Sequence, residues 1–215
     1  MARYRRLGRV DQPQERPYHH GQLRRALLDA AVEEVQRVGA SALSMREIAR
    51  RAGVSHAAPL HHFGDKAGLF TAIATEGFEL AVEMIAPAAR SASAFIDGGA
   101  AYIVFALSHP GHYEVMFRPE LHDAADPGLV AARDAAFDLL HDSAADSLPV
   151  GSAADAADLA LVGWSLSHGF ATLWLSGNLQ DRVGTPEDAT QRWLHGLALL
   201  GAIAQERLAA DSSGD

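Results

Sequence analysis

The chain has 215 residues, enough for one large or two modest domains with a sizeable apolar core. It lacks cysteine, which excludes disulfides and thiolate metal sites. Its net charge of −9 is uneven, because residues 1–70 hold 12 Lys and Arg against 7 Asp and Glu, whereas residues 71–215 hold 6 against 20. Only the basic first third therefore suits a nucleic acid, and the acidic remainder would be repelled by it.

Residues 1–17 are polar, with five arginines and two prolines. As a flexible basic N-terminal arm, they would add phosphate or minor-groove contacts; the alternative is a solvated tail with no partner. No apolar run of a signal peptide follows, and no run in the chain reaches membrane-spanning length. The sequence therefore predicts a cytoplasmic protein with no membrane partner.

A helix is predicted from His20, because apolar residues recur at helical spacing through Leu23, Leu27 and Val35. Gly39 is its expected stop, since glycine commonly ends helices. This helix would form a supporting wall behind the segment that follows.

Residues 44–70, SMREIARRAGVSHAAPLHHFGDKAGLF, predict two short helices joined by a tight turn. Ser44 can cap the first helix, with Glu47 completing a capping box. Gly53 stands where the chain must turn, and Ser55 is a suitable cap for a second short helix over residues 56–62. This arrangement is a helix-turn-helix.

The same stretch resembles the DNA-binding signature of the tetracycline-repressor (TetR) family of transcriptional regulators. The positions in register are Ser44, Ile48, Ala49, Ala52, Gly53, Val54, Ser55, Phe63, Lys66 and Leu69. The family usually has a tyrosine at the position of Leu60, whose hydroxyl contacts a phosphate, and Leu60 cannot make that bond. Pro59 is unusual too; four residues after the expected cap, it should cost about one helical hydrogen bond.

Candidate DNA-contacting residues combine small side chains, hydrogen-bonding groups and cations: Ser44, Arg46, Ser55, His56, Ala57, Pro59, Leu60, His61 and Lys66. His56, Ala57 and His61 are expected at bases or the adjacent backbone, with Arg46 reaching from the preceding helix. Lys66 is the only lysine in the chain. It begins the next helix, where its charge and the helix N-terminus both favour a phosphate.

Asp65 is the expected cap of a long helix that ends before Pro87. A helix of roughly 20 residues spans about 30 Å, so this one can join the DNA-binding head to the rest of the chain. Further helices are predicted over residues 93–108, 112–117, 126–147, 151–176 and 185–208, and no alternating strand pattern occurs. We therefore expect an all-α fold. Its parts are the arm (1–17), a three-helix helix-turn-helix domain (18–81) and a helical-bundle ligand-binding and dimerisation domain (82–215).

The second domain resembles the "WHG" type of TetR-family C-terminal domain. The matching segments are AYIVFALSHPGHYEVMF, at residues 101–117, and WSLSHGFA, whose Trp164, His168 and Gly169 are the namesake positions. Of the last two long helices, the first is apolar nearly all round, and the second carries Trp193, Leu197 and Leu200 on one side; this pair indicates a homodimer seam. A two-fold axis of this kind is what a palindromic double-stranded DNA operator requires.

Aromatic residues from different predicted helices suggest a cavity for a small-molecule effector that is hydrophobic or amphipathic. The candidate ligand-binding residues are Tyr102, Phe105, Tyr113, Phe117, Phe137, Trp164 and His168. No catalytic residue, metal site or cofactor is predicted. His109 and His112 flank Pro-Gly without a carboxylate at a recognised ligand spacing, and no G-x-S-x-G motif supports Ser165 as a nucleophile.

These features predict a homodimeric repressor released from its operator by an effector. Two alternatives stay open on sequence alone: an activator built on the same fold, and an effector-free autoregulatory or architectural DNA-binding factor.

Overall fold

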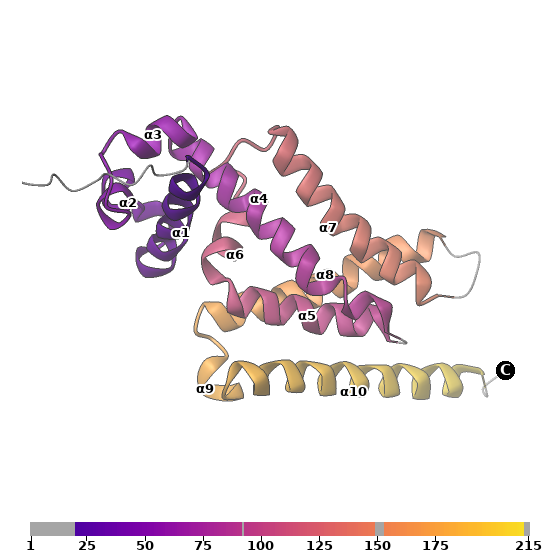
Figure 1. Cartoon of the computed structure of the whole chain (residues 1–215). Helices are drawn as coiled ribbons and strands as arrows, with labels where there is room; N and C mark the ends of the chain where they lie inside the picture. Colours follow the sequence, from indigo (N-terminus) through magenta and orange to yellow (C-terminus); the bar gives the residue numbers. More distant parts are fainter. Residues whose placement is uncertain (1–19, 92, 149–152, 213–215) are drawn as a thin grey trace, which may run out of the picture.

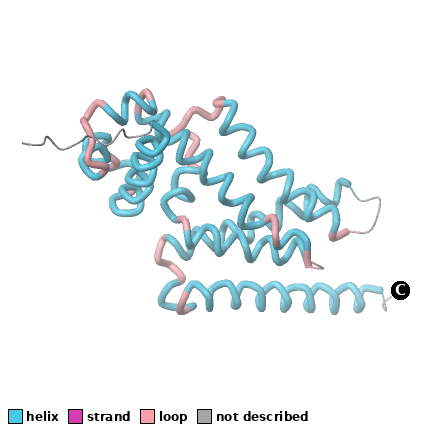
Figure 2. Tube along the Cα trace, viewed as in Figure 1, coloured by secondary structure: helices cyan, strands magenta, loops and turns pink. Residues whose placement is uncertain are grey.

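The computed structural model describes residues 20–91, 93–148 and 153–212, and in these ranges every regular element is helical (Figures 1 and 2). The predicted basic arm lies outside the described residues. None of the described helices is long and apolar enough to cross a membrane. The elements are α1 (His20–Val38), η1 (Ala40–Ala42), α2 (Met45–Arg51), α3 (Ala58–Phe63), α4 (Lys66–Ile85), η2 (Ala88–Arg90), α5 (Ala94–Ser108), α6 (Pro110–Met116), α7 (Pro127–Asp146), α8 (Ala153–Leu175), α9 (Gln180–Val183) and α10 (Pro186–Ser212).

Helices α1, α2 and α3 form the head, at one end of the molecule in Figure 1. Leu27 of α1 and Ile48 of α2 are fully buried against one another's helices, because the apolar stripe of α1 faces inward. The hydroxyl of Ser44 accepts a hydrogen bond from the Glu47 amide at 3.4 Å, as expected of a cap. Gly53 has φ +68°, a conformation that glycine adopts without steric cost, so the turn between α2 and α3 forms where predicted.

The second helix of the motif begins later than predicted. Ser55 does not cap it: the Ser55 carbonyl accepts from the Ala58 amide at 3.0 Å, and the cap position falls to Ala57, which has no capping side chain. His56 and Ala57 therefore lie in the turn before α3. Pro59 stands in the first turn of the helix, where the missing N–H would have no helical acceptor, so the expected loss of a hydrogen bond does not occur.

The predicted capping box is also only half formed. Both carboxylate oxygens of Glu47 bind the guanidinium of Arg50, at 2.8 and 2.6 Å, and do not return to Ser44. A charged partner three residues away on the same helix outcompetes a backbone amide for this carboxylate.

Helix α4 joins the head to the remaining helices, which we call the body (Figure 1). The carboxylate of Asp65 caps it by accepting from the Gly68 amide at 2.8 Å, and the helix ends before Pro87, as the sequence predicts. It packs against α1 and α3 in the head and against α5, α6 and α7 in the body. A single element therefore contacts both parts of the molecule.

The body is a bundle in which α5 and α7 both pack against α8, while α10 lies along α5 (Figure 1). Two glycines permit close contacts: a β-carbon at residue 163 would lie 2.2 Å from the ring of Phe95, and one at residue 99 would lie 2.6 Å from the ring of Trp193. Helix α6 begins at Pro110, two residues before its predicted start, and the short helix α9 was not predicted.

Head and body share one continuous hydrophobic core. Buried residues of α1, such as Leu27, belong to the same cluster as Phe105 of α5 and Val115 of α6. Helix α6 is seated tightly, since a β-carbon at Gly111 would lie 2.8 Å from the Val32 carbonyl oxygen of α1, and one at Gly77 of α4 would lie 2.5 Å from Sδ of Met116. Close-packed interiors transmit displacement rather than absorb it, so a shift of α6 must move α1 or α4.

Candidate nucleic-acid interface and ligand cavity

The exposed edge of the helix-turn-helix carries most of the predicted DNA-contacting residues. Ser44 and Arg46 are exposed on the α2 side. Five further positions follow in the turn and on α3, where Ser55, His56, Ala57, Leu60 and His61 are all exposed. Leu60 is 52% exposed, an unusual environment for leucine and one that leaves it open to a partner. These residues form one contiguous chain segment that can approach a DNA groove.

Two of the predicted residues have a different environment. The ring of Pro59 is buried beneath α3, so it supports the helix and cannot reach a base. The Lys66 amine lies 3.4 Å from the Ser41 carbonyl oxygen and 5.4 Å from the ring centroid of Phe70. The amine therefore starts from an intramolecular contact with the loop between α1 and α2, which it would have to share with a phosphate or leave.

Most cations of the head are bound to carboxylates of the head. Seven Lys and Arg residues lie between residues 20 and 70, and four of them pair with acidic side chains: Arg25, Arg37, Arg50 and Arg51. The carboxylate of Glu34, only 2% exposed, binds Arg37 at 2.8 Å and Arg51 at 3.3 Å. Because Arg51 belongs to α2 and Glu34 to α1, this pairing fixes the two helices together. The positive charge of the head is thus largely structural.

Arg24 is a further cation beside α3 that the sequence did not single out. Its guanidinium lies 5.1 Å from the centroid of the Phe63 ring at the end of α3. Phe63 is 39 residues away in the chain, so only the packing of α1 on α3 brings the two side chains together.

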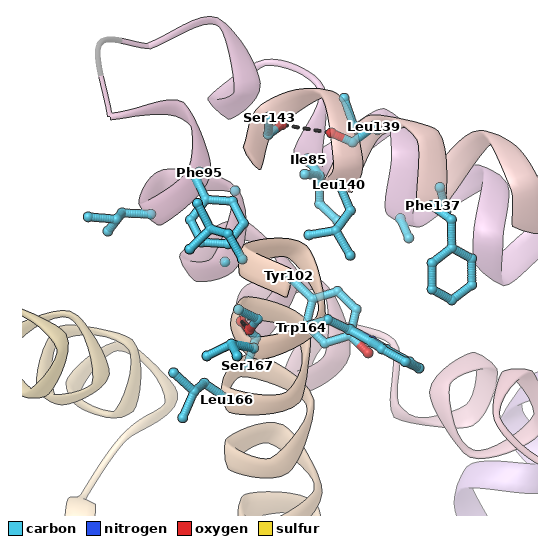
Figure 3. A pocket seen from close by; sticks show the side chains of 18 of the residues that line it. Ile85, Phe95, Tyr102, Phe137, Leu139, Leu140, Ser143, Trp164, Leu166 and Ser167 are labelled. Carbon is cyan, nitrogen blue, oxygen red and sulfur yellow. Dashed lines mark hydrogen bonds between the residues drawn. The ribbon is translucent and has the colours of Figure 1, made fainter. Parts of the chain in front are cut away.

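The body encloses an apolar cavity of about 310 Å³ lined by α4, α5, α6, α7, α8 and α10 (Figure 3). Four of the predicted ligand-binding residues line it: Tyr102, Phe117, Phe137 and Trp164. Phe137 meets Trp164 edge-on, with ring centroids 5.2 Å apart. Figure 3 shows Tyr102 and Trp164 close together, with Phe95 and Phe137 on opposite sides of the cavity.

Two more of the predicted residues stand behind this wall as a hydrogen-bonded group. The hydroxyls of Tyr102 and Tyr113 lie 2.8 and 3.0 Å from Nδ1 of His168. Tyr113 also reaches Thr172 at 2.9 Å. Burial lowers the pKa of His168 and raises the pKa of both tyrosines, so the group is neutral at pH 7. It holds α5, α6 and α8 together.

Phe105 lies outside the cavity. Its side chain is fully buried in the common core and stacks on His109 at 5.4 Å, although it lies only one helical turn from Tyr102, with the two ring centroids 6.4 Å apart. Conversely, the sequence missed several lining residues, among them Phe78, Phe95, Met116 and Trp193. Aromatic residues are recognisable in a sequence, but which side of a buried helix faces a void depends on the packing of its neighbours.

The polar side chains of the lining are already bonded to their own helices. Ser143 donates to the Leu139 carbonyl at 2.7 Å, and Ser167 donates to the Gly163 carbonyl at 2.9 Å. No lining residue is Asp, Glu, Lys, Arg or His. An ion entering this cavity would lose hydration without gaining a partner, so the cavity favours an uncharged molecule.

Helix α6 connects the cavity wall to the head. Met116 and Phe117, at its C-terminal end, line the cavity. On the same helix, the carboxylate of Glu114 accepts a hydrogen bond at 2.8 Å from the amide of Ala40, which belongs to η1 between α1 and α2. The sequence pointed to α4 as the connection, and the structure adds α6 as a second one.

His109 and His112, the histidines considered as metal ligands, lie with their ring centroids 5.9 Å apart. His168 is held by the tyrosines, whereas Nε2 of His112 lies 3.9 Å from Glu76 of α4. Burial lowers the pKa of His112. Among the described residues, no group of three or more His, Cys, Asp or Glu side chains is placed to hold a metal ion.

Two family models match the sequence. Residues 27–73 match the model for bacterial regulatory proteins of the tetR family, and residues 95–201 match the model for the tetracyclin repressor-like C-terminal domain. The first covers the core of the head and the start of α4, and the second covers most of the body. None of the curated proteins matches the sequence.

Solved structures share the fold over most of the chain. A protein of unknown function from Rhodococcus sp. RHA1 is 34% identical, with a TM-score of 0.68 over 85% of this chain and 98% of that one. The TetR-family regulator PfmR from Thermus thermophilus is 18% identical, with a TM-score of 0.59 over 79% and 94% of the two chains. A tetR-family transcriptional regulator from Streptomyces coelicolor is 20% identical, with a TM-score of 0.62 over 87% and 83%.

Proposed function

Because the chain belongs to the tetracycline-repressor family of DNA-binding transcriptional regulators, we propose that it is a homodimeric repressor released from a palindromic operator by an uncharged apolar molecule. It regulates transcription and is not an enzyme. The family membership supplies the DNA-binding activity, whereas the repressor role, the dimer and the effector are our proposal. We place the boundary between the DNA-binding and effector-binding parts within α4, near residue 81.

The observation that carries the proposal is that the cavity and the head share structural elements. Phe78 and Ile85 of α4 line the cavity, and Leu69 and Phe70 near the start of the same helix are buried in the core of the head. Helix α6 provides the second connection, through Met116 to the cavity and Glu114 to the loop at residue 40. A DNA-binding factor without an effector has no need of a void bounded by these two helices.

The switch follows from differential binding. A ligand that fits the cavity only when α4 and α6 occupy one of two positions will favour that position. In a dimer, moving α4 changes the distance between the two α3 helices, and a palindromic site tolerates little change in that distance. The ligand's effect is limited to its differential affinity, which for typical coupling of about 1–3 kcal/mol weakens DNA binding by about 5- to 150-fold.

The dimer is proposed from the outer faces of α8 and α10. Leu173 of α8 is 48% exposed, and Leu200 and Ile203 of α10 are 57% and 62% exposed. Large apolar side chains exposed on two long helices that both pack against α5 indicate a covered surface in the assembled protein. A two-fold axis through this surface would place two heads on one face of a DNA duplex.

The direct test is selection of duplexes from a random pool by the purified protein, followed by measurement of the stoichiometry of the complex. We expect an enriched palindrome with half-site centres about 34–36 Å apart, or a multiple of that distance, bound by two chains or by a multiple of two. Placing the selected site across a promoter should lower transcription of a reporter when the protein is present. A monomer that enriches no symmetric sequence would contradict the proposal, and increased transcription would favour the activator alternative.

A further inference from the structure

The cavity in the body is open to solvent in the single chain. Four of its lining residues remain substantially exposed to solvent: Ile96 at 46%, Phe137 at 37%, Val162 at 55% and Leu166 at 41%. They come from α5, α7 and α8, and Figure 3 shows Leu166 and Phe137 on different sides of the void. An apolar ligand in this site would therefore still touch water along the exposed rim, which weakens its binding.

The open rim continues into an uncovered apolar stripe on α8. Val162, Leu166, Gly169 and Leu173 follow one another at helical spacing on one side of the helix. Leu173 is 48% exposed, and a β-carbon built at Gly169 would meet no atom within 4 Å. The first two residues of the stripe line the cavity, and the last two extend beyond it. One surface therefore serves both as the cavity rim and as an apolar helix face.

Helix α10 also has some residues that line the cavity and others that are exposed beyond it. Trp193 and Leu197 line the cavity, whereas Leu199, Leu200 and Ile203 are 52–62% exposed and do not. The helix packs mainly against α5 and α9, so its outer face is left uncovered. A β-carbon at Gly196 or Gly201 would again meet nothing within 4 Å.

The charges of the body indicate what covers these faces. Residues 71–215 carry 20 acidic against 6 basic side chains, so two copies of the body repel one another in most orientations. Residues 159–180, which include the exposed stripe of α8, contain no Asp, Glu, Lys or Arg. This is a face on which a second copy can approach without like-charge repulsion, and an apolar face opposite its own copy is self-complementary.

We propose that the second copy of the chain forms the missing wall of the effector cavity, so that each effector site is completed by the partner subunit. This inference rests on the proposed dimer and effector. It adds that dimerisation itself closes the effector cavity. Covering Val162 and Leu166 removes the ligand's exposed side from water. By linkage, a ligand that prefers the closed cavity tightens the dimer by the same factor by which dimerisation tightens ligand binding.

The test uses N-phenyl-1-naphthylamine, a neutral aromatic fluorophore, as the ligand probe. Its affinity is measured by fluorescence titration at several concentrations of the full-length protein, with the oligomeric state followed by sedimentation velocity. The probe affinity of the unaltered protein should fall as dilution produces monomer, and saturating probe should shift the dimer–monomer midpoint to lower protein concentration. This measurement needs no variant and so is independent of folding defects.

Variants distinguish the effect of dimerisation from that of changing the cavity lining. Leu200→Glu and Ile203→Glu place a charge on the outer face of α10 without altering any lining residue. They should give folded monomers, checked by circular dichroism, whose probe affinity is lower by at least about tenfold, equivalent to about 1.4 kcal/mol of lost apolar burial. Val104→Glu is the matched control, because Val104 is 42% exposed on α5 and lies outside both the cavity and the two uncovered faces.

The outcomes are distinct. Folded monomers that bind the probe as tightly as the dimer, or a probe affinity independent of dilution, would overturn the shared cavity while leaving the proposed repressor and its effector intact. A dimer that takes up no probe at all would instead contradict the apolar effector site, and the shared wall with it. An unaltered protein that is monomeric at every concentration would contradict the proposed dimer.

Discussion

The head and the body of this regulator differ in how far each satisfies its own surface groups. In the head, four of the seven cations between residues 20 and 70 are bound to carboxylates, and the buried Glu34 holds two of them. In the body, the polar groups around the cavity bond to one another or to their own helices, while large apolar side chains of α8 and α10 remain exposed. The head is completed by its own charges, whereas the body is not completed by its own apolar groups.

This difference means that the rigidity of the head and its affinity for DNA have separate sources. Ion pairs between helices fix the shape of the helix-turn-helix but leave few cations for phosphates, so a single head should bind DNA weakly. In the proposed dimer, the body would supply what the head lacks, because it would link two weakly binding heads into one bivalent DNA-binding unit. The four predictions that follow test this division, starting with the largest effect.

Truncating Phe105 and Phe137 should separate the core of the body from its open rim. Phe105→Ala removes a fully buried ring and should lower the free energy of unfolding by about 3–5 kcal/mol. Phe137→Ala removes a ring that is 37% exposed and should cost only about 1 kcal/mol, mainly its edge contact with Trp164, while weakening the binding of a cavity ligand. Urea denaturation of both variants measures the difference. Equal costs would place Phe137 in the core and contradict an open rim.

Adding a hydrogen-bond donor to α3 should strengthen DNA binding by the head. Leu60 is 52% exposed, at the position where related regulators usually have a phosphate-binding tyrosine. Leu60→Tyr should therefore tighten operator binding by about 2- to 10-fold, the value of one hydrogen bond to a phosphate. Leu60→Phe is the control, since it supplies the ring without the hydroxyl. A similar gain from both variants would show that contact area, and not a hydrogen bond, is responsible.

Substitutions of Lys66 and His56 should separate phosphate contacts from base contacts. Lys66→Ala should weaken binding to all sequences alike and reduce the dependence of log K on log salt concentration by about one unit. His56→Ala should instead change which duplexes are preferred, because His56 is exposed in the turn before α3, where base contacts are expected. Titrations of the operator and of mismatched duplexes at several salt concentrations measure both. A change of preference on Lys66→Ala, with none on His56→Ala, would reverse the two roles.

The sequence predicted the all-α fold and the helix-turn-helix well, because caps, stops and apolar spacing are local signals. Asp65 and Gly53 act as the sequence predicts. It failed where tertiary contacts decide the outcome. It also misplaced one local signal, because α3 begins at Ala58 and not at His56, which puts Pro59 in the first turn of the helix.

The candidate sites show the same limit. The aromatic content predicted an apolar cavity, but only packing distinguishes Tyr102, which lines it, from Phe105, which lies one turn further along the same helix and fills the core. The packing of α3 likewise buries Pro59, which the sequence had suggested as a DNA contact. The bond from Glu114 to the Ala40 amide joins residues 74 apart in the chain, and nothing in the local sequence indicates it.

The smallest expected effect is on the pH dependence of stability, at the seam between head and body. Burial lowers the pKa of His112, which faces Glu76 of α4, Arg25 and Asp29 of α1, and His109 beside its own helix. The unfolded chain then binds a proton at higher pH than the folded chain does. The contribution of His112 to stability is therefore complete above its ordinary pKa of about 6.5 and declines as the pH falls below that value.

His112→Gln should flatten the loss of thermal stability between pH 7 and pH 5, as measured by melting temperature at each pH. His168, whose pKa burial also lowers, contributes with the same sign and should retain part of the slope in this variant. His141→Gln is the control, because His141 is exposed on α7. An unchanged slope in His112→Gln would show that the seam does not exclude the charged form of the histidine.

The central claim is that occupation of the cavity in the body weakens DNA binding by the head. Its most direct test is the operator affinity of the dimer, measured by fluorescence anisotropy with and without a neutral aromatic ligand identified by displacement of N-phenyl-1-naphthylamine. We expect the saturating ligand to raise the melting temperature and to weaken operator binding by about 5- to 150-fold. Trp164→Ala, which enlarges the cavity, should reduce both effects together. Ligands that bind the cavity tightly and stabilise the protein, yet all leave operator affinity unchanged, would contradict the account.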